Sequence, residues 1–297
     1  MKILLHFRHF PVAMGRFFHW GLQDLNHEVF TVGPYSNGRI PWGDQYYYPL
    51  YKYPPDYILP EVNLDVNDVL KAIPFKPDVI VQAADTIWFT GKAPVPNIIL
   101  GTDPHVLDYT PRLQDADYFA CMQHQYMKPT PNIKKSVWVP YGYDPNIHRV
   151  IHEEEKYDVV LCGLQYEHRL KAVEAMKAAG LRVFNALGLI YDEYVKTYNQ
   201  GLIAFNWSSK EDIPARFWEG LAMKRLVLTN RVPDLSLIDF KEDEHYIAYS
   251  SVEEAVEKAT YYASHRTEAL RIATNGYLKV KNHTYRNRAA TLLSLLK

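Results

Sequence analysis

Apolar runs with the length and composition of β-strands alternate with helical patterns along nearly the whole chain, and this alternation limits the possible folds more than any other feature. Such alternation is typical of parallel βαβ units, because parallel strands need a long crossover that is usually a helix. In the first half we expect strands at residues 2–7, 28–32, 78–82, 97–101, 118–122 and 136–139, with helices at 15–25 and 65–73.

The alternation breaks once, near the middle of the chain. Residues 140–156 are rich in Pro, Gly, Asp and Glu, as expected of a linker. A second series follows, with strands expected at 158–162, 181–185, 202–207 and 226–229 and helices at 169–179, 191–198, 214–224, 252–263, 268–279 and 285–296. The chain therefore predicts an α/β fold of two Rossmann-like, doubly wound domains that face each other across a ligand cleft. We place the domains at 1–148 and 149–297 and leave open that the last helix packs back on the first domain.

The charge balance narrows the range of partners. Lys and Arg total 33 against 34 Asp and Glu, a formal net charge of -1, which argues against a broad basic face for nucleic acid. No apolar run reaches the roughly 18 residues that a membrane-spanning helix needs, and residues 1–7 indicate a first strand instead of a signal peptide. The two cysteines are too few for a disulfide framework, which fits a reducing compartment. We therefore expect a cytoplasmic protein without a transmembrane segment or stable nucleic-acid binding.

The strongest local pattern lies at residues 205–224, where the order is strand, loop, helix. We expect Asp212 to cap the helix and Pro214 to stand in its first turn, where the missing N–H is not needed. Free backbone N–H groups at a helix start form an anion site. Polar side chains beside it complete the predicted site: Asn206, Ser208, Ser209 and Lys210.

Arg216 and Glu219 lie one turn apart on that predicted helix and therefore on one face. A guanidinium matches the oxygens of a diphosphate, and a carboxylate accepts two hydrogen bonds of the kind that vicinal ribose hydroxyls donate. The alternative is an ion pair within the helix on a solvated face. Phe217 and the apolar residues around it argue against a fully solvated face, and we include Phe217 in the predicted nucleotide site.

Glu211 and Glu219 are separated by seven residues, which resembles the E-x7-E pattern of retaining GT-B glycosyltransferases of the family 4 type. Residues 219–230 are similar to the segment where those enzymes have Glu-Ala-x-Ala-x-Gly before a strand, except that Lys224 stands in place of the glycine. A closer likeness is to the CgeB-like glycosyltransferases of the spore maturation type. It covers most of residues 95–297 and depends on the segments 138–145, 158–163 with Arg169, 216–219 and 283–288.

The resemblance implies a donor site in the second domain. Glu219 would bind the nucleotide ribose, and Glu211 would lie against the transferred sugar or the diphosphate. Arg216 and Arg169 would contact the diphosphate, and Gly163, at the end of the first strand of this domain, would let the backbone approach the donor. Retention of the anomeric configuration is implied in the same way. The donor would be a nucleoside-diphosphate sugar, with a UDP-sugar as the first expectation, and no cofactor or metal is expected besides it.

The first domain is expected to act on the acceptor. Asp103 and His105 follow the strand at 97–101, and in relatives a His or Asp after the corresponding strand meets the donor sugar or the acceptor hydroxyl. These two residues are our candidates for positioning the nucleophilic hydroxyl or taking its proton. The alternative, that Asp103 caps the next helix and His105 is an ordinary exposed residue, stays open. In the loop before the first helix, Gly15 is expected to let backbone N–H groups face the reacting phosphate.

Tyrosines gather at residues 46–57. Aromatic rings stack on the faces of sugars while tyrosine hydroxyls form hydrogen bonds, so this segment is a candidate grip for a glycan acceptor. The alternative is a surface loop, stiffened by proline, that packs its rings on its own domain.

Other patterns argue against metal and dinucleotide chemistry. The D-x-D string at 115–117 precedes an apolar strand instead of following one, so we expect capping or solvation there. His6 and His9 have no companions at metal-ligand spacing. The chain has neither a G-x-G-x-x-G fingerprint after its first strand nor a P-loop.

These expectations converge on transfer of a sugar from a nucleotide-sugar donor to a hydroxyl of a glycan, a small molecule or another acceptor. Other functions stay open: a GT-B-fold epimerase or phosphorylase, a DNA-modifying glycosyltransferase of the phage type, and a catalytically idle binding protein. The neutral charge balance argues against duplex DNA. No lysine stands out as the Schiff-base site of a phosphorylase cofactor.

Overall fold

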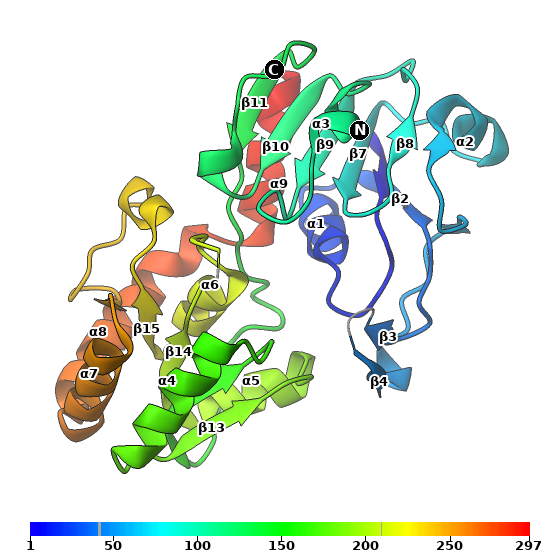
Figure 1. Ribbon diagram of the computed structural model, residues 1–297. Helices are drawn as coiled ribbons and strands as arrows, with labels where there is room; N and C mark the ends of the chain where they lie inside the picture. The colour runs from blue at the N-terminus through cyan, green and yellow to red at the C-terminus, as the bar shows by residue number, and fades with distance from the viewer. Residues whose placement is uncertain (41–42, 209) are drawn as a thin grey trace. The chain divides into compact units, whose positions relative to one another are not determined.

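The computed structural model describes residues 1–40, 43–208 and 210–297, and the chain divides into two compact units (Figure 1). Unit 1 consists of Met1–Pro140 and Tyr285–Lys297, and unit 2 is Tyr141–Thr284. The sequence predicted a boundary after residue 148. In the structure the first unit ends earlier in the linker, at Pro140, and the last segment of the chain belongs to unit 1.

Unit 1 is built on a seven-stranded sheet in which all neighbouring strands are parallel. Its strands are β1 (Lys2–His6), β2 (Glu28–Gly33), β5 (Tyr57–Ile58), β7 (Val79–Ala84), β9 (Asn97–Gly101), β10 (Tyr118–Cys121) and β11 (Lys135–Trp138). The order across the sheet is β11-β10-β9-β7-β1-β2-β5, so the direction of winding reverses between β1 and β7. This is the Rossmann order, in which ligands bind outside the carboxyl ends of the strands at the reversal.

Helices cover this sheet because its central strands are apolar on both faces. Ile3, Leu4 and Leu5 of β1 are fully buried, as expected of a parallel strand between two helical layers. The helices of unit 1 are α1 (Met14–Gln23), α2 (Val66–Ala72), α3 (Thr110–Leu113) and α9 (Tyr285–Leu293). Figure 1 shows α9 beside α1, and the two are so close that a Cβ on Gly21 would lie 2.5 Å from the carbonyl oxygen of Tyr285.

Short elements decorate unit 1. An antiparallel pair joins β3 (Arg39–Ile40) to β4 (Gly43–Tyr47), and a parallel pair joins β6 (Leu64–Asp65) to β8 (Phe89–Thr90). The 3-10 turns η1 (Pro49–Tyr51) and η2 (His124–Tyr126) complete the connections. The sequence did not predict these strands, since runs of two to five residues carry little periodicity.

Unit 2 has a five-stranded sheet, again with all neighbours parallel. Its strands are β12 (Tyr157–Cys162), β13 (Val183–Ala186), β14 (Gly201–Asn206), β15 (Leu226–Asn230) and β16 (Ile247–Tyr249). The order β13-β12-β14-β15-β16 reverses between β12 and β14, which is the other common doubly wound order. The sequence missed β16, which has only three residues.

Helices pack on both faces of this second sheet, and each face has its own apolar core. The helices are α4 (Glu167–Ala178), α5 (Tyr191–Asn199), α6 (Ala215–Ala222), α7 (Val252–Ser264) and α8 (Arg266–Lys279). One core contains buried residues of α5 and α6, and the other contains buried residues of α4, α7 and α8. The predicted α/β class with parallel sheets is therefore confirmed. Among the helices that the structure describes, none has the length and the apolar character that crossing a membrane requires.

Candidate functional site

The carboxyl ends of β12 and β14 meet where the winding of the unit 2 sheet reverses. Gly163 follows β12, and Asn206 is the last residue of β14. Helix α6 begins after the loop that follows β14 and carries Arg216 and Glu219. Four residues predicted to bind a nucleotide therefore gather at the place where open α/β sheets bind their ligands.

Arg216 bridges the two strand ends. Its Nη1 donates to the carbonyl oxygen of Cys162 at 3.0 Å, and its Nη2 donates to Oδ1 of Asn206 at 3.3 Å. Gly163 has a φ of 146°, and a Cβ there would lie 2.3 Å from Arg216 Nη1. The sequence predicted that Gly163 makes room for a donor. The structure shows that it makes room for the guanidinium of Arg216.

Asn206 is held from two sides. Its side-chain Nδ2 donates to Oγ1 of Thr229 at 2.8 Å, and its carbonyl oxygen accepts from the Tyr249 hydroxyl at 2.7 Å. The residue is 1% exposed. These bonds turn Oδ1 toward Arg216, so Asn206 orients the guanidinium at the strand ends.

The loop before α6 is closed by Ser208 and Asp212. The Ser208 hydroxyl donates to Oδ1 of Asp212 at 2.5 Å, and the backbone N–H of Asp212 donates back to the Ser208 hydroxyl at 3.0 Å. The prediction that Asp212 caps the helix is wrong, because α6 begins at Ala215 with Pro214 as its N-cap residue and no side-chain cap bond. The Ser208 hydroxyl donates to Asp212, and its predicted part in the anion site stays a prediction, while Ser209 lies outside the described residues.

Glu211 stands in this loop and not on the helix. It is exposed, and its backbone φ is 59°, a left-handed conformation that is uncommon for a residue other than glycine. Left-handed backbone at such residues is often found at functional sites. Glu211 and Glu219 therefore do not share a helix face, although the spacing between them holds in the sequence.

Glu219 is 8% exposed and faces two partners. Its Oε2 accepts from the Tyr194 hydroxyl at 2.5 Å, and its Oε1 lies 3.4 Å from Nε2 of His148. Burial, and then the nearby Glu219 carboxylate, raise the pKa of Tyr194 well above its usual value, so the hydroxyl keeps its proton. The alternative of an Arg216–Glu219 ion pair is not what the described residues show, because Arg216 bonds to the strand ends instead.

Arg169 on α4 ties two loops together. Its guanidinium donates to the carbonyl oxygen of Trp207 at 2.9 and 2.7 Å and to that of Leu164 at 2.9 Å. Burial, and then the charge of Arg216, lower the pKa of Arg169 to about 10, which leaves it charged at neutral pH. Arg169, which was predicted to contact the diphosphate, thus holds the loop after β12 against the loop after β14.

Phe217 requires a correction. It is 0% exposed, and its ring packs in the apolar core with ring centres of Tyr246 and Phe240 at 5.3 and 6.0 Å. Adjacent residues on a helix point about 100° apart, so Phe217 faces the core when Arg216 faces the strand ends. The predicted nucleotide contact of Phe217 is therefore wrong, and its role is packing.

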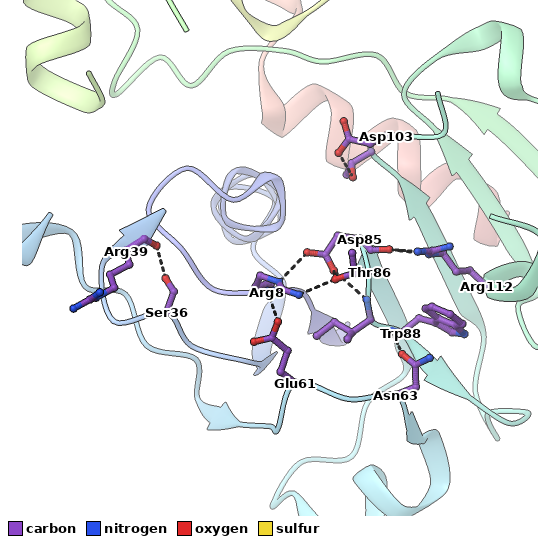
Figure 2. A network of polar contacts seen from close by, with 12 residues as sticks. Arg8, Ser36, Arg39, Glu61, Asn63, Asp85, Thr86, Trp88, Asp103 and Arg112 are labelled. Atoms are coloured by element: carbon purple, nitrogen blue, oxygen red, sulfur yellow. Dashed lines mark hydrogen bonds and ion pairs between the residues drawn. The ribbon is translucent and has the colours of Figure 1, made fainter. Parts of the chain in front are cut away.

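A second polar cluster lies at the reversal of the unit 1 sheet (Figure 2). Arg8, just after β1, lies between two carboxylates, with Nε 3.2 Å from Oδ2 of Asp85 and Nη1 2.5 Å from Oε1 of Glu61. Its Nη2 donates to Oγ1 of Thr86 at 2.7 Å. Asp85 was not singled out from the sequence. A signal was present, because Asp85 follows an apolar strand directly, and ligands of open α/β sheets bind outside the carboxyl ends of the strands.

Asp103 and His105 are brought together in a turn after β9. His105 Nε2 is 4.0 Å from Oδ1 of Asp103, and the carbonyl oxygen of Asp103 accepts from the N–H groups of Val106 and Leu107. The His105 side chain is 12% exposed and that of Asp103 is 44% exposed. His105 is thus not the ordinary exposed residue of the alternative interpretation.

Gly15 lies inside α1, and its small size has a packing reason. A Cβ there would come within 2.2 Å of the Phe7 ring. Its predicted phosphate contact stays a prediction. Among the tyrosines of the 46–57 segment, Tyr53 packs on its own unit, with the Arg16 guanidinium 4.1 Å from its ring centre, while Tyr47 is 45% exposed.

The D-x-D string is structural. The Asp117 carboxylate is 6% exposed and forms ion pairs with Lys92 at 2.9 Å and Lys134 at 3.0 Å. Burial acts to raise the pKa of Asp117, but hydrogen bonds from both lysines bring it below the usual value. Asp115 accepts from the N–H of Gly91 at 2.7 Å. The expectation of a solvated or capping pair is therefore corrected for Asp117, whose buried carboxylate pairs with two exposed lysines.

The family follows from the sequence of the second half. Residues 145–294, more than half of the 297, match the sequence model of a family described as glycosyl transferase-like. The chain belongs to this glycosyltransferase family. No curated protein sequence matches it.

Solved structures of glycosyltransferases have the same fold as this glycosyltransferase. Sucrose-phosphate synthase from Thermosynechococcus elongatus aligns with a TM-score of 0.64 at 11% identity, over 100% of this chain and 98% of that one. A glycosyltransferase from Rickettsia africae aligns at 0.63 and 12%, over 100% and 98%. HepE from Anabaena, solved in complex with UDP-glucose, aligns at 0.63 and 12%, over 100% and 99%. The predicted fold of two Rossmann-like domains of the GT-B type is confirmed.

Proposed function

We propose that this glycosyltransferase moves a sugar from a UDP-sugar to an acceptor hydroxyl, with retention of configuration and without a metal ion. One observation supports the proposal. The guanidinium of Arg216 on α6 lies against Gly163 where the winding of the unit 2 sheet reverses, and the buried Glu219 carboxylate lies one turn along α6. Arg216, Gly163 and Glu219 form this arrangement.

Arg216 and the backbone amides at the start of α6 would hold the diphosphate. Nη1 and Nη2 of Arg216 each use one bond on the strand ends, and each carries a second N–H that can reach a phosphate oxygen. A positive charge fixed in place before the reaction stabilises the leaving diphosphate, which is the task of Mg²⁺ in other transferases. Arg169 would act by holding the loops and not by direct contact.

Glu219 would accept the ribose hydroxyls, and Glu211 would lie against the transferred sugar or the diphosphate. The choice of uridine is supported by HepE, which was solved with UDP-glucose and shares the fold. Retention is supported by the likeness of the 211–219 spacing to the family 4 and CgeB-like enzymes. These assignments remain proposals for this chain.

The acceptor would be a glycan, a small molecule or another hydroxyl compound. Asp103 and His105 would position the acceptor hydroxyl or take its proton, since a carboxylate near an imidazole suits that task. A cytoplasmic location stays a prediction. An idle binding protein is the rival that the test below separates. A DNA-modifying enzyme is the other alternative, and binding to duplex DNA that weakens steeply with salt would indicate it.

Release of UDP from a panel of UDP-sugars tests the proposal. Transferases of this kind slowly hydrolyse their donor when no acceptor is present. We therefore expect UDP release from at least one UDP-sugar, unchanged by EDTA and lost in Glu219→Ala. NMR of the freed sugar reports the anomer that forms first. Binding without release would indicate an idle protein, and neither binding nor release for any nucleotide sugar would overturn the proposal.

A further inference from the structure

The Glu219 carboxylate is gripped by side chains from two separate segments of unit 2. Tyr194 comes from α5, and His148 comes from the segment before β12. Together they contact both carboxylate oxygens, Tyr194 at Oε2 and His148 at Oε1. The two aromatic rings stand edge to face at 6.0 Å. We call Tyr194, His148 and Glu219 the carboxylate clamp.

The ring of His148 is oriented by the backbone around Asp144. The N–H of Asp144 donates to Nδ1 of His148 at 3.1 Å, and the N–H of His148 donates to the carbonyl oxygen of Asp144 at 2.7 Å. Since Nδ1 accepts a hydrogen bond, the neutral ring carries its proton on Nε2. That proton faces Oε1 of Glu219. The local turn thus selects the tautomer that supports the carboxylate.

Tyr194 and His148 use only half of the hydrogen-bond acceptor sites of the Glu219 carboxylate. An ionised carboxylate has about four lone-pair sites, two on each oxygen. Tyr194 occupies a site on one oxygen and His148 faces the other, so one site on each oxygen remains. Two acceptor sites, one on each oxygen, match in number the two vicinal hydroxyls of a ribose. The side chain is 11% exposed, so a carboxylate without its partners would bear an uncompensated desolvation cost.

We propose that Tyr194 and His148 are positioning residues that set the preference of this enzyme for ribonucleotide donors. They hold Glu219 in one orientation, so that it takes the 2′ and 3′ hydroxyls together. This inference rests on the proposed function, since it requires a nucleoside diphosphate at this site. A merely structural pair would affect stability and leave the recognition of ribose hydroxyls unchanged.

The test compares UDP with 2′,3′-dideoxy-UDP by calorimetric titration, with the ratio of their dissociation constants as the readout. We expect the wild type to bind UDP at least about a hundredfold more tightly, because dideoxy-UDP lacks both hydroxyls and each hydrogen bond to a charged group is worth about tenfold. Tyr194→Phe, which removes one oxygen atom, is expected to reduce the ratio about tenfold, mostly by weakening UDP. His148→Leu is expected to act in the same direction.

Two variants serve as comparisons. Tyr198→Phe removes a buried hydroxyl one turn along α5 that accepts from the N–H of Cys162 at 3.3 Å, and it is expected to keep the wild-type ratio. His148→Gln keeps a donor near Oε1 and is expected to restore most of the ratio lost in His148→Leu. Circular dichroism checks that each variant folds.

The outcomes are distinguishable. An unchanged ratio in both Tyr194→Phe and His148→Leu overturns the clamp and leaves the proposed function standing. A wild type that binds UDP and dideoxy-UDP equally overturns the ribose assignment of Glu219 and the clamp with it. A wild type that binds neither overturns the proposed function as well.

Discussion

Arg216 lies so close to Gly163 that a methyl group on the glycine would stand 2.3 Å from Nη1 of the guanidinium. The contact joins the end of β12 to helix α6, at the reversal of the unit 2 sheet. A side chain at position 163 and the observed guanidinium are therefore mutually exclusive. The glycine is required by the arginine it touches.

Gly163→Ala is expected to displace Arg216 and to weaken UDP binding about tenfold, the value of one charge-assisted bond. Gly180→Ala is the matched control, because Gly180 also has a positive φ, 87°, but has no atom within 4 Å of an added Cβ. The control is expected to lose about 1 kcal/mol of stability from backbone strain and to keep its UDP affinity. Equal affinity losses in both variants would show that strain alone, and not the arginine, is responsible.

Phe217→Leu is expected to lower the free energy of unfolding by about 1 kcal/mol without changing the dissociation constant of UDP. The reason is that Phe217 lies in the core with 0% exposure. Phe205→Leu, at an equally buried phenylalanine of the other core, is expected to behave alike. Urea unfolding and a UDP titration give the two numbers. UDP binding that is tenfold weaker in Phe217→Leu but unchanged in Phe205→Leu would show that Phe217 contacts the nucleotide after all.

His105→Ala is expected to lower the rate of UDP release from the preferred UDP-sugar by about a hundredfold, which is typical for loss of a general base. UDP affinity should stay near the wild-type value, because His105 belongs to unit 1 while Arg216 and Glu219 belong to unit 2. His124→Ala changes an exposed histidine of the same unit and serves as the control. Full turnover in His105→Ala would remove the residue from the catalytic machinery.

The buried His6 predicts how stability depends on pH. Burial lowers the pKa of His6 from 6.5 to about 3, and its ring stacks on Phe89 at 4.1 Å. At a pH between 6.5 and about 3, His6 is protonated in the unfolded chain but not in the folded one. The free energy of unfolding therefore falls as the pH is lowered below 6.5. His6→Leu is expected to reduce the loss between pH 7.5 and pH 5 by about 2 kcal/mol.

The exposed His152 provides the comparison for this pH effect, and His152→Leu is expected to keep the wild-type dependence. Urea unfolding at the two pH values measures it. If His6→Leu lost as much stability on acidification as the wild type, the acid sensitivity would have to come from other groups. His9 is the next residue to test, since burial also lowers its pKa to about 3.

The long parallel strands were predictable because each is an apolar run with a helix after it. The predicted strand at 158–162 lies within β12 (Tyr157–Cys162), for example. The strand β16 (Ile247–Tyr249) was missed because three residues show no period. The cap of α6 (Ala215–Ala222) was misassigned because Asp212 forms its hydrogen bonds with Ser208 and not with the N–H groups of the helix.

The site was only partly predictable. Arg216 and Glu219 were found because one helical turn places them together in the sequence. His148 and Tyr194 were missed because they reach Glu219 from other segments, and their local patterns give no sign of that contact. Phe217 was misassigned because the choice between a core face and a ligand face depends on tertiary packing, which a helical period alone does not decide.

Calorimetric titration of UDP into the wild type and Glu219→Ala measures whether Glu219 binds the nucleotide of the donor. We expect saturable binding at one site per chain and at least about a hundredfold weaker binding in the variant, since both ribose hydroxyls lose their acceptor. The Gly180→Ala protein, treated in parallel, should match the wild type. Failure of UDP to bind the wild type, or equal affinity in Glu219→Ala, would contradict the donor site described for unit 2.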